Sequence, residues 1–264
     1  YKITFDGKNR QRLALIYGKA LDFTGHIFFD IVKPTARAVD FEVSIDETQT
    51  PTTPEAHFFV ASELEKMDVQ ATSVAPRFCG EFQKGIDYIG DLEQFEKELK
   101  IHAEIAEHFG YRLSIHSGSD KFKVFPIIGH YTKGRVHVKT AGTNWLEALR
   151  VIAENNPGLF RRIYAFALQH FEEATKYYHV TTDLSKVADI TELSDEELTG
   201  VLTQDDTRQM LHITYGLILT ARDEDNKSLF RDELYETLNL HEDDYYKALE
   251  RHIGKHVELL NSNK

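Results

Sequence analysis

Four short strand-like segments alternate with helix-like segments between residues 39 and 155, and this alternation restricts the possible folds most strongly. In the first segment, VDFEVSI at 39–45, every second residue is apolar, which is the period of a β-strand. The other strand-like segments are QATSVAPRF at 70–78, YRLSIH at 111–116 and RVHVK at 135–139. Strands that alternate with helices predict a parallel sheet.

The intervening helices are marked by residues that favour helix ends. The segment 92–109 has apolar residues at helical spacing, with Asp91 as a good N-cap and Gly110 as a good C-cap. The other helices of this region are expected to start at Pro54, at Asp120, and at Thr143 or Asn144. An apolar stretch at 12–32 predicts one or two further helices before the first strand.

The fold class expected from this order is α/β, of the (β/α)8 TIM-barrel type. A barrel needs eight strands and the sequence offers four, so we expect the second half of a barrel, with the first half absent from this chain. Residues 1–158 are assigned to the barrel portion. Residues 159–264 read as helices only and are assigned to a C-terminal helical extension packed on the barrel or on a neighbouring subunit. The alternative is a doubly wound open sheet, but no Gly-rich nucleotide loop supports it.

The composition of the chain excludes several classes of function and of partner. A net charge of -12 argues against nucleic-acid binding, which needs clustered Lys and Arg. No apolar run approaches the roughly 20 residues of a membrane span. The single cysteine, Cys79, excludes an intrachain disulfide and a thiolate zinc cluster, and we expect a cytoplasmic protein. Four parallel strands leave an edge and an open apolar face, so the missing half or a second copy is expected as a partner.

Glu81 and His116 are the candidate metal ligands. Each follows a predicted strand, and one helix and one strand separate them, so both side chains can reach one site from adjacent strand ends. Carboxylate and imidazole together suit Mn, Fe, Co, Ni or Zn better than Ca. The alternative is that Glu81 is a loop carboxylate and His116 a hydrogen-bonded core residue.

Carboxylates at the first strand are candidates for acid or base catalysis. Glu42 and Asp46 share the polar face of this strand, and Glu47 begins the loop that follows. A carboxylate beside a metal can act as general acid or base, and we favour Glu47 and Glu42 for that role. A solvated loop is the alternative.

Two polar turns, HSGSDK at 116–121 and KTAGT at 139–143, follow the third and fourth strands and place backbone N–H groups ahead of helices. Such turns bind anions, including carboxylates, although ordinary helix capping also explains their composition. The candidate substrate-binding residues are Ser117, Lys121, His137, Lys139 and Thr143, with Arg77 and Lys84 from the preceding loop. His252 and His256 lie at i, i+4 in the helical extension, and we interpret them as surface residues.

Three segments together resemble the tagaturonate epimerase family: GEFQKGIDYIGD at 80–91, LSIHSGSDKF at 113–122 and HVKTAGTNWLEALR at 137–150. The resemblance extends over roughly residues 39–178. It implies a barrel enzyme of hexuronate catabolism that uses a divalent metal to interconvert D-tagaturonate and D-fructuronate. It also strengthens the metal role of Glu81 and His116.

The implied reaction inverts C4 of a 2-keto hexuronate. Because C4 is not adjacent to the C2 ketone, enolisation alone cannot invert it. Cleavage of the C3–C4 bond by a retro-aldol step, rotation of the aldehyde and re-addition can, with a metal stabilising the enediolate. The alternatives are a metal-dependent sugar-acid aldolase or ketose isomerase, and a non-catalytic sugar-acid binding protein.

Overall fold

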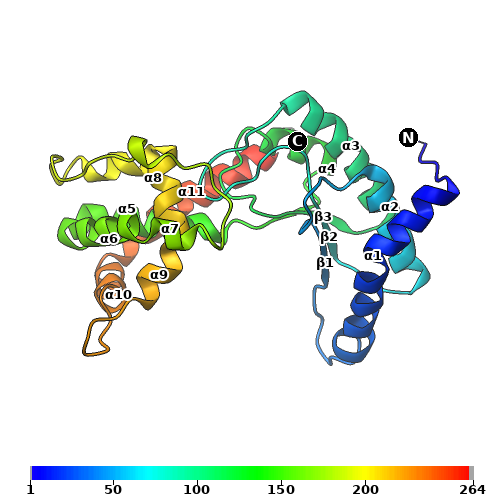
Figure 1. The fold of residues 1–264 in the computed structure, drawn as a ribbon, viewed down its shortest axis with the longest axis horizontal. Helices are drawn as coiled ribbons and strands as arrows, with labels where there is room; N and C mark the ends of the chain where they lie inside the picture. Colours follow the sequence, from blue (N-terminus) through cyan, green and yellow to red (C-terminus); the bar gives the residue numbers. More distant parts are fainter. Residues whose placement is uncertain (1, 262–264) are drawn as a thin grey trace.

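A four-stranded parallel sheet lies at the centre of one lobe of the molecule, and the computed structural model describes residues 2–261 (Figure 1). The strands are β1 (Glu42–Ile45), β2 (Ser73–Pro76), β3 (Arg112–Ile115) and β4 (Val136–Val138). They lie in the order β1-β2-β3-β4, and every neighbouring pair is parallel. The alternating pattern therefore predicted the strands and their direction correctly, with each strand shorter than its apolar segment.

A helix follows each strand: α2 (Pro54–Lys66), α3 (Leu92–Phe109), α4 (Phe125–Thr132) and α5 (Ala141–Asn155). The predicted limits of α3 are confirmed. The Asp91 side chain accepts hydrogen bonds from the backbone N–H groups of Glu93 and Gln94, and Gly110 ends the helix with a φ of 81°. That left-handed conformation is one that glycine adopts without steric cost.

Two predicted helix starts are wrong. Helix α4 begins at Phe125 rather than at Asp120, whose φ of 59° is left-handed. Helix α5 begins at Ala141, so Thr143 lies in its first turn and does not cap it. In both places the polar side chain is engaged by a distant part of the chain, as described below.

The N-terminal stretch forms one continuous helix. Helix α1 (Gly7–Ile27) passes directly into a π-helical turn, η1 (Phe28–Val32), and neither of its internal glycines breaks it. Gly25 allows a close approach, because a Cβ there would lie 2.5 Å from the Met67 side chain. Several large apolar side chains remain exposed on this segment: Leu15, Ile16, Phe23, Phe29 and Ile31.

The helices after α5 build a second hydrophobic core. It starts at Leu146 in α5 and extends to Leu234 in α10 (Arg231–Leu240). The intervening helices are α6 (Pro157–Gln169), α7 (Phe171–Ala174), η2 (Leu184–Lys186), η3 (Leu198–Thr203), α8 (Asp205–Ile213) and α9 (Tyr215–Thr220). Within the described residues, no helix is long and apolar enough to cross a membrane.

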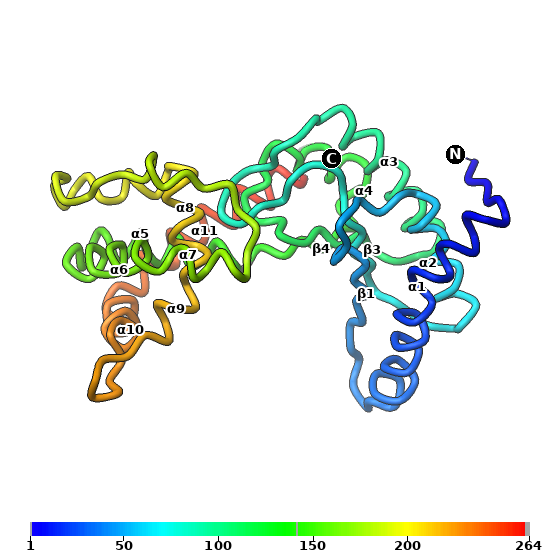
Figure 2. Tube along the Cα trace, viewed as in Figure 1, coloured from blue at the N-terminus to red at the C-terminus, as the bar shows by residue number. Residues whose placement is uncertain are grey.

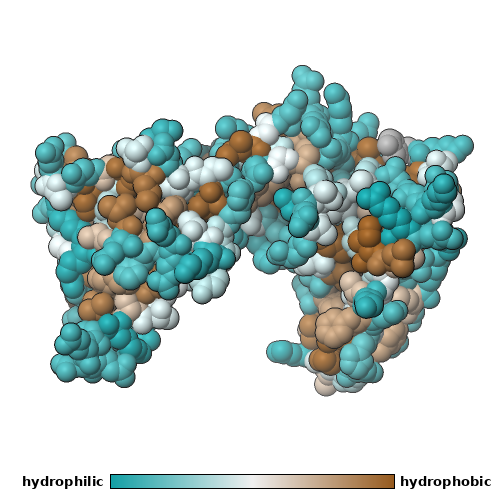
Figure 3. Space-filling view, viewed as in Figure 1, coloured by the Kyte–Doolittle hydropathy of each residue, from teal (hydrophilic) through white to brown (hydrophobic). Residues whose placement is uncertain are grey.

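The last helix connects the two lobes. Helix α11 (Glu242–Asn261) runs from the helical lobe back to the sheet lobe and packs against α4 and α5 (Figure 2). Its contact with α4 is close, because a Cβ added at Gly129 would lie 2.0 Å from the backbone oxygen of Leu260. The surface is broadly hollowed between the two lobes (Figure 3).

Candidate active site

His116, at the C-terminal end of β3, lies between two carboxylates from the first strand. Its Nε2 atom is 2.7 Å from Glu42 Oε1, and its Nδ1 atom is 2.7 Å from Asp46 Oδ2. The intervening strand allows this reach because it carries a small residue, Ser73, whose hydroxyl donates to Glu42 Oε2 at 2.7 Å. The hydrogen bond to Asp46 raises the pKa of His116; burial opposes this effect, and the bond to Glu42 adds to it.

Glu42 is held on both oxygens. Besides His116 and Ser73, its carboxylate contacts His137 on β4, with 2.7 Å between Oε2 and Nδ1. Burial raises the pKa of Glu42, but hydrogen bonds, first from His116 and then from Ser73, outweigh burial and lower the pKa to about 2. A carboxylate with so low a pKa is a weak base at neutral pH, so Glu42 is better suited to hold other groups than to remove protons.

The acidic cluster opens into two adjoining cavities, which we call the strand-end cleft. The first has a volume of ≈ 390 Å³ and the second ≈ 260 Å³. Both are lined by Asp46, Glu47, Gln83, Lys84, His116 and Ser117. Glu47 is exposed to both cavities, whereas Asp46 Oδ1 is buried and has no hydrogen-bond partner among the described residues.

Glu81 lies in the wall of the first cavity, as does His116. Its backbone pairs with Ile89, and its carboxylate is 3.8 Å from Nε2 of His179. The two predicted metal ligands therefore share a cavity, but the carboxylates in contact with His116 belong to Glu42 and Asp46.

Three predicted cationic residues also line the strand-end cleft. Lys84 donates a hydrogen bond to the Ser117 hydroxyl at 3.0 Å, and Lys139 lines the second cavity. Burial and then repulsion by Lys139 lower the pKa of Lys84. Arg77 lines the first cavity while its guanidinium donates to the Thr48 carbonyl.

Lys121 and Thr143 were expected to bind substrate, but both side chains are buried and bonded within the protein. The Lys121 side chain is fully buried, and its ammonium donates to the carbonyls of Gln83 at 2.9 Å, Ile86 at 2.5 Å and Ser119 at 2.9 Å. All three N–H donors are thus used within the protein. Thr143 is buried too, and its hydroxyl lies 2.8 Å from His252 Nε2.

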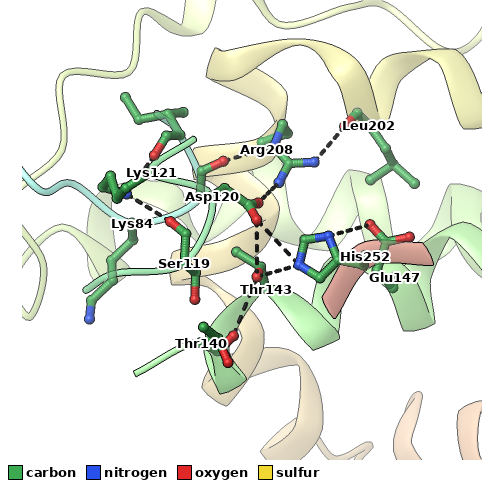
Figure 4. Close-up of polar contacts among 12 residues, drawn as sticks. Lys84, Ser119, Asp120, Lys121, Thr140, Thr143, Glu147, Leu202, Arg208 and His252 are labelled. Carbon is green, nitrogen blue, oxygen red and sulfur yellow. Dashed lines mark hydrogen bonds and ion pairs between the residues drawn. The ribbon is translucent and has the colours of Figure 1, made fainter. Parts of the chain in front are cut away.

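The interpretation of His252 and His256 as surface residues is wrong. Both pack against Asp120, with Asp120 Oδ1 3.2 Å from His252 Nε2 and 3.3 Å from His256 Nε2. Arg208 of α8 binds the other carboxylate oxygen (Figure 4). Asp120, His252 and His256 are the one group among the described residues with three possible metal-ligand atoms within 4.8 Å of one another. However, the Arg208 guanidinium already neutralises Asp120, and the Asp120 N–H donates to His256 Nε2 at 3.1 Å. We interpret the group as a link between loop and helices.

Comparison with known proteins identifies the family of the chain. The sequence model of a family described as tagaturonate epimerase (UxaE) matches residues 1–260. The chain belongs to this family. The match extends well beyond residues 39–178 and includes most of the helical extension.

Relatives within the family are similar over nearly the whole chain. A tagaturonate/fructuronate epimerase of Thermotoga maritima is 47% identical over 260 residues, which cover 98% of this chain and 53% of the relative. Crystal structures of fructuronate-tagaturonate epimerase UxaE from Cohnella laeviribosi, native and glycerol-complexed, are 58% identical with a TM-score of 0.95. They too match 98% of this chain, which covers 53% of theirs. The chain spans about half the length of these relatives.

Sequence reasoning missed the contribution of α8 to the site of this family member. His212 lines the second cavity of the strand-end cleft, and Arg208 Nε donates to the Gly85 carbonyl at 2.7 Å. Gln209 donates to the Gln83 side chain at 2.9 Å. These partners are more than 120 positions apart in the chain, so no local pattern could have identified them.

Proposed function

We propose that this chain provides an active-site half of an epimerase that interconverts D-tagaturonate and D-fructuronate. The observation that carries the proposal is that His116 and Asp46 meet at the carboxyl ends of β3 and β1, with Glu42 also in contact with His116, beside a cleft that presents Lys84 and Lys139. A keto-uronate combines a carboxylate with neighbouring carbonyl and hydroxyl oxygens. The lysines can bind the carboxylate, and a metal or an acid-base residue can act on the carbonyl and hydroxyl oxygens. The names of the relatives support the choice of substrate.

A divalent cation fits the residues around His116. Asp46 Oδ1 is buried without a partner among the described residues, which leaves a negatively charged oxygen for which a cation would compensate. Carboxylate oxygens and imidazole nitrogen are the donor set preferred by Mn, Fe, Co, Ni and Zn. We infer that His116, with Glu81 in the same cavity wall and the carboxylates of Glu42 and Asp46 beside it, would supply part of the metal's ligands. Further ligands would come from another part of the protein, because these residues do not bring three ligand atoms within 4.8 Å of one another. When bound, such a metal supplies Lewis-acid stabilisation of negative charge on sugar oxygens.

Glu47 is the residue that we assign to proton transfer. Its carboxylate lines both cavities, whereas that of Glu42 is fully engaged and has a pKa of about 2. Removal of the C4 hydroxyl proton breaks the C3–C4 bond and gives an aldehyde at C4 and an enediolate over C2 and C3. After the aldehyde rotates, C3 adds to its other face and the proton returns to O4, so the atoms and charges balance. Lys84 and Lys139 would hold the carboxylate during this rotation.

The decisive experiment is to incubate the full-length protein with D-tagaturonate and to follow the products by NMR. We expect D-fructuronate to appear and a chelator to stop its formation. Release of two three-carbon products would instead show an aldolase, another six-carbon isomer a different isomerase, and no turnover a binding protein.

The metal ligands can be tested by metal content. We expect His116→Ala and Glu81→Gln each to lower bound metal per chain while the protein stays folded, because function rather than packing concentrates at strand ends. His130, exposed on α4, provides the matched control, and His130→Ala should retain full metal content. Full metal content in both site variants would exclude the proposed ligands.

Lys139→Met tests the site for the carboxylate. The change keeps the length of the side chain but removes its charge. We expect kcat/KM for the uronate to fall on the order of a hundredfold, or about 2.7 kcal/mol, with fold and metal retained. Lys100→Met on the exposed face of α3 is the control. Activity of the Lys139 variant within about threefold of the parent would place the carboxylate elsewhere, with Arg77 next to be tested.

We also propose the architecture and surroundings of the site. The four parallel strands would form the second half of a (β/α)8 barrel, with residues 1–158 as the barrel portion and residues 159–264 as the helical extension. Support comes from the strand order and from relatives about twice as long as this chain. Another part of the protein or a second copy would cover the open edge of the sheet. A cytoplasmic location, which the single free cysteine favours, stays a prediction.

A further inference from the structure

The second cavity of the strand-end cleft has the properties of an anion site. One side of it is lined by two lysines, Lys84 and Lys139, by Ser117 and Ser119, and by Gly142 at the beginning of α5. The carboxylates of Asp46 and Glu47 also line this cavity, so an anion is favoured only where the lysines and α5 lie nearer to it than these carboxylates do. The free N–H groups and the dipole of a helix N-terminus favour a negative charge there. Helix α5 has 15 residues, so its dipole is fully developed.

His212 is the one strongly buried imidazole that lines this cavity among the described residues. The side chain is 7% exposed, and its Nδ1 atom is buried without a hydrogen-bond partner among these residues. The opposite edge of the ring faces α5, since a Cβ added at Gly142 would lie 2.9 Å from His212 Nε2. Placing the proton on Nε2 leaves only a lone pair at the buried Nδ1 atom and directs an N–H group towards Gly142, which also lines the cavity.

The imidazole is neutral at physiological pH. Burial lowers the pKa of His212 to about 4, and the nearby cations Lys84, Arg208 and Lys121 contribute to that effect. A neutral imidazole among lysines does not repel them, yet it still offers one hydrogen-bond donor.

Helix α8 is held firmly enough to present this donor. Arg208 binds the Gly85 carbonyl at 2.7 Å and the buried carboxylate of Asp120. Gln209 binds the side chain of Gln83 at 2.9 Å and the Lys84 carbonyl at 3.3 Å. These contacts anchor α8 to the two loops that carry the lysine and serines of the cavity.

We propose that His212 is a substrate-binding residue that donates a hydrogen bond from Nε2 to the carboxylate of the sugar acid in the second cavity. The inference rests on the proposed function and adds to it a residue from the helical extension. Lys84 and Lys139 supply the charge, while His212 fixes the orientation of the carboxylate, because a hydrogen bond is directional.

The test compares the binding of a keto-uronate and of the corresponding neutral ketose to the full-length protein by calorimetry. Loss of a hydrogen bond to a charged group costs on the order of tenfold or more in affinity. We therefore expect His212→Leu to weaken uronate binding at least ~tenfold and to leave binding of the neutral ketose within about twofold. His212→Gln should stay within about threefold of the parent, because its amide nitrogen can occupy the Nε2 position. His130→Leu is the matched control on the surface.

A second variant keeps His212 but displaces its ring. Gly142→Ala adds a Cβ 2.9 Å from Nε2, so the ring must shift, whereas alanine favours helix α5. We expect weaker uronate binding in this variant at an unchanged unfolding temperature, and little further loss when the change is added to His212→Leu. Gly142→Ala therefore still tests the proposal if His212→Leu fails to fold.

The outcomes separate the two proposals. If His212→Leu weakens the binding of the keto-uronate and the neutral ketose equally, or weakens neither, the role of His212 is overturned. Epimerase activity of the parent would still uphold the proposed function in that case. If the parent neither binds nor converts the keto-uronate, the proposed function itself fails, and the inference fails with it.

Discussion

Replacing Asp120 by asparagine should destabilise the protein severely, because this carboxylate joins the sheet lobe to two helices of the extension. The change preserves shape but removes a charge that faces Arg208 of α8 and two histidines of α11. It also points an amide N–H₂ group or an uncharged oxygen at the guanidinium, which then lies buried without its counter-ion.

The structure sets the size of the effect. The side chains of Asp120 and Arg208 are 5% and 13% exposed, so solvent screens the pair only weakly. Breaking a buried pair by removing one partner costs about 3–5 kcal/mol. Arg208 retains its bonds to the carbonyls of Gly85 and Leu202, so we expect a value near the lower limit, about 3 kcal/mol.

Urea denaturation of the full-length protein, followed by circular dichroism, would measure this change in unfolding free energy. The matched control is Glu107→Gln, which removes the partner of Lys133 in a pair whose side chains are 59% and 69% exposed. Its denaturation midpoint should not change measurably, because exposed pairs contribute little. A loss below about 1 kcal/mol in Asp120→Asn would show that the link between the lobes does not depend on this charge.

Two other perturbations test the packing of the sheet lobe. Gly129→Ala places a Cβ 2.0 Å from the Leu260 backbone oxygen, so it should cost at least about 1–3 kcal/mol and increase hydrogen exchange at the end of α11. Gly158→Ala should do neither, because its added Cβ would meet only the Asn156 side chain, at an ordinary contact distance of 3.9 Å. Burial lowers the pKa of His102 to about 4, so the unfolded chain binds the extra proton first as pH falls below the ordinary value of 6.5. The free energy of unfolding should therefore fall on the order of 3 kcal/mol between pH 6.5 and 4. Equal denaturation midpoints at pH 7.5 and pH 5 would contradict this reasoning. So would a His102→Asn variant whose unfolding free energy depends on pH as steeply as that of the parent.

Those parts of the fold that depend on near neighbours in the chain could be predicted from the sequence. Helix α3 is the clearest case, because Asp91 caps N–H groups two and three residues away and Gly110 closes the same helix. The strands could be predicted equally well, because buried parallel strands are short apolar runs between polar turns. His116 was found for the same reason, because it directly follows such a run, whereas Glu42 was found because it lies on the polar face of the alternating first strand.

Asp120 shows where local reading fails. An aspartate ahead of an apolar segment normally caps a helix, but here its carboxylate binds Arg208, 88 residues later, and the backbone takes a left-handed conformation. His252 and His256 were misread for the same reason: their spacing marks one face of a helix but does not show that a buried carboxylate from another lobe lies against it.

Helix α5 explains how the extension can influence chemistry at the strand ends. Its first turn borders the strand-end cleft through Gly142, while its later residues, from Leu146 onwards, belong to the core of the helical lobe. Helix α8 contacts the same lobe and reaches the cleft through His212. A rigid helix with one end in each region must move as a unit, because interiors are close-packed and transmit displacement. The position of the helical lobe therefore determines how far Gly142 and His212 lie from His116 and Ser117 at the end of β3, and with it the width of the cavity in which we place the substrate carboxylate.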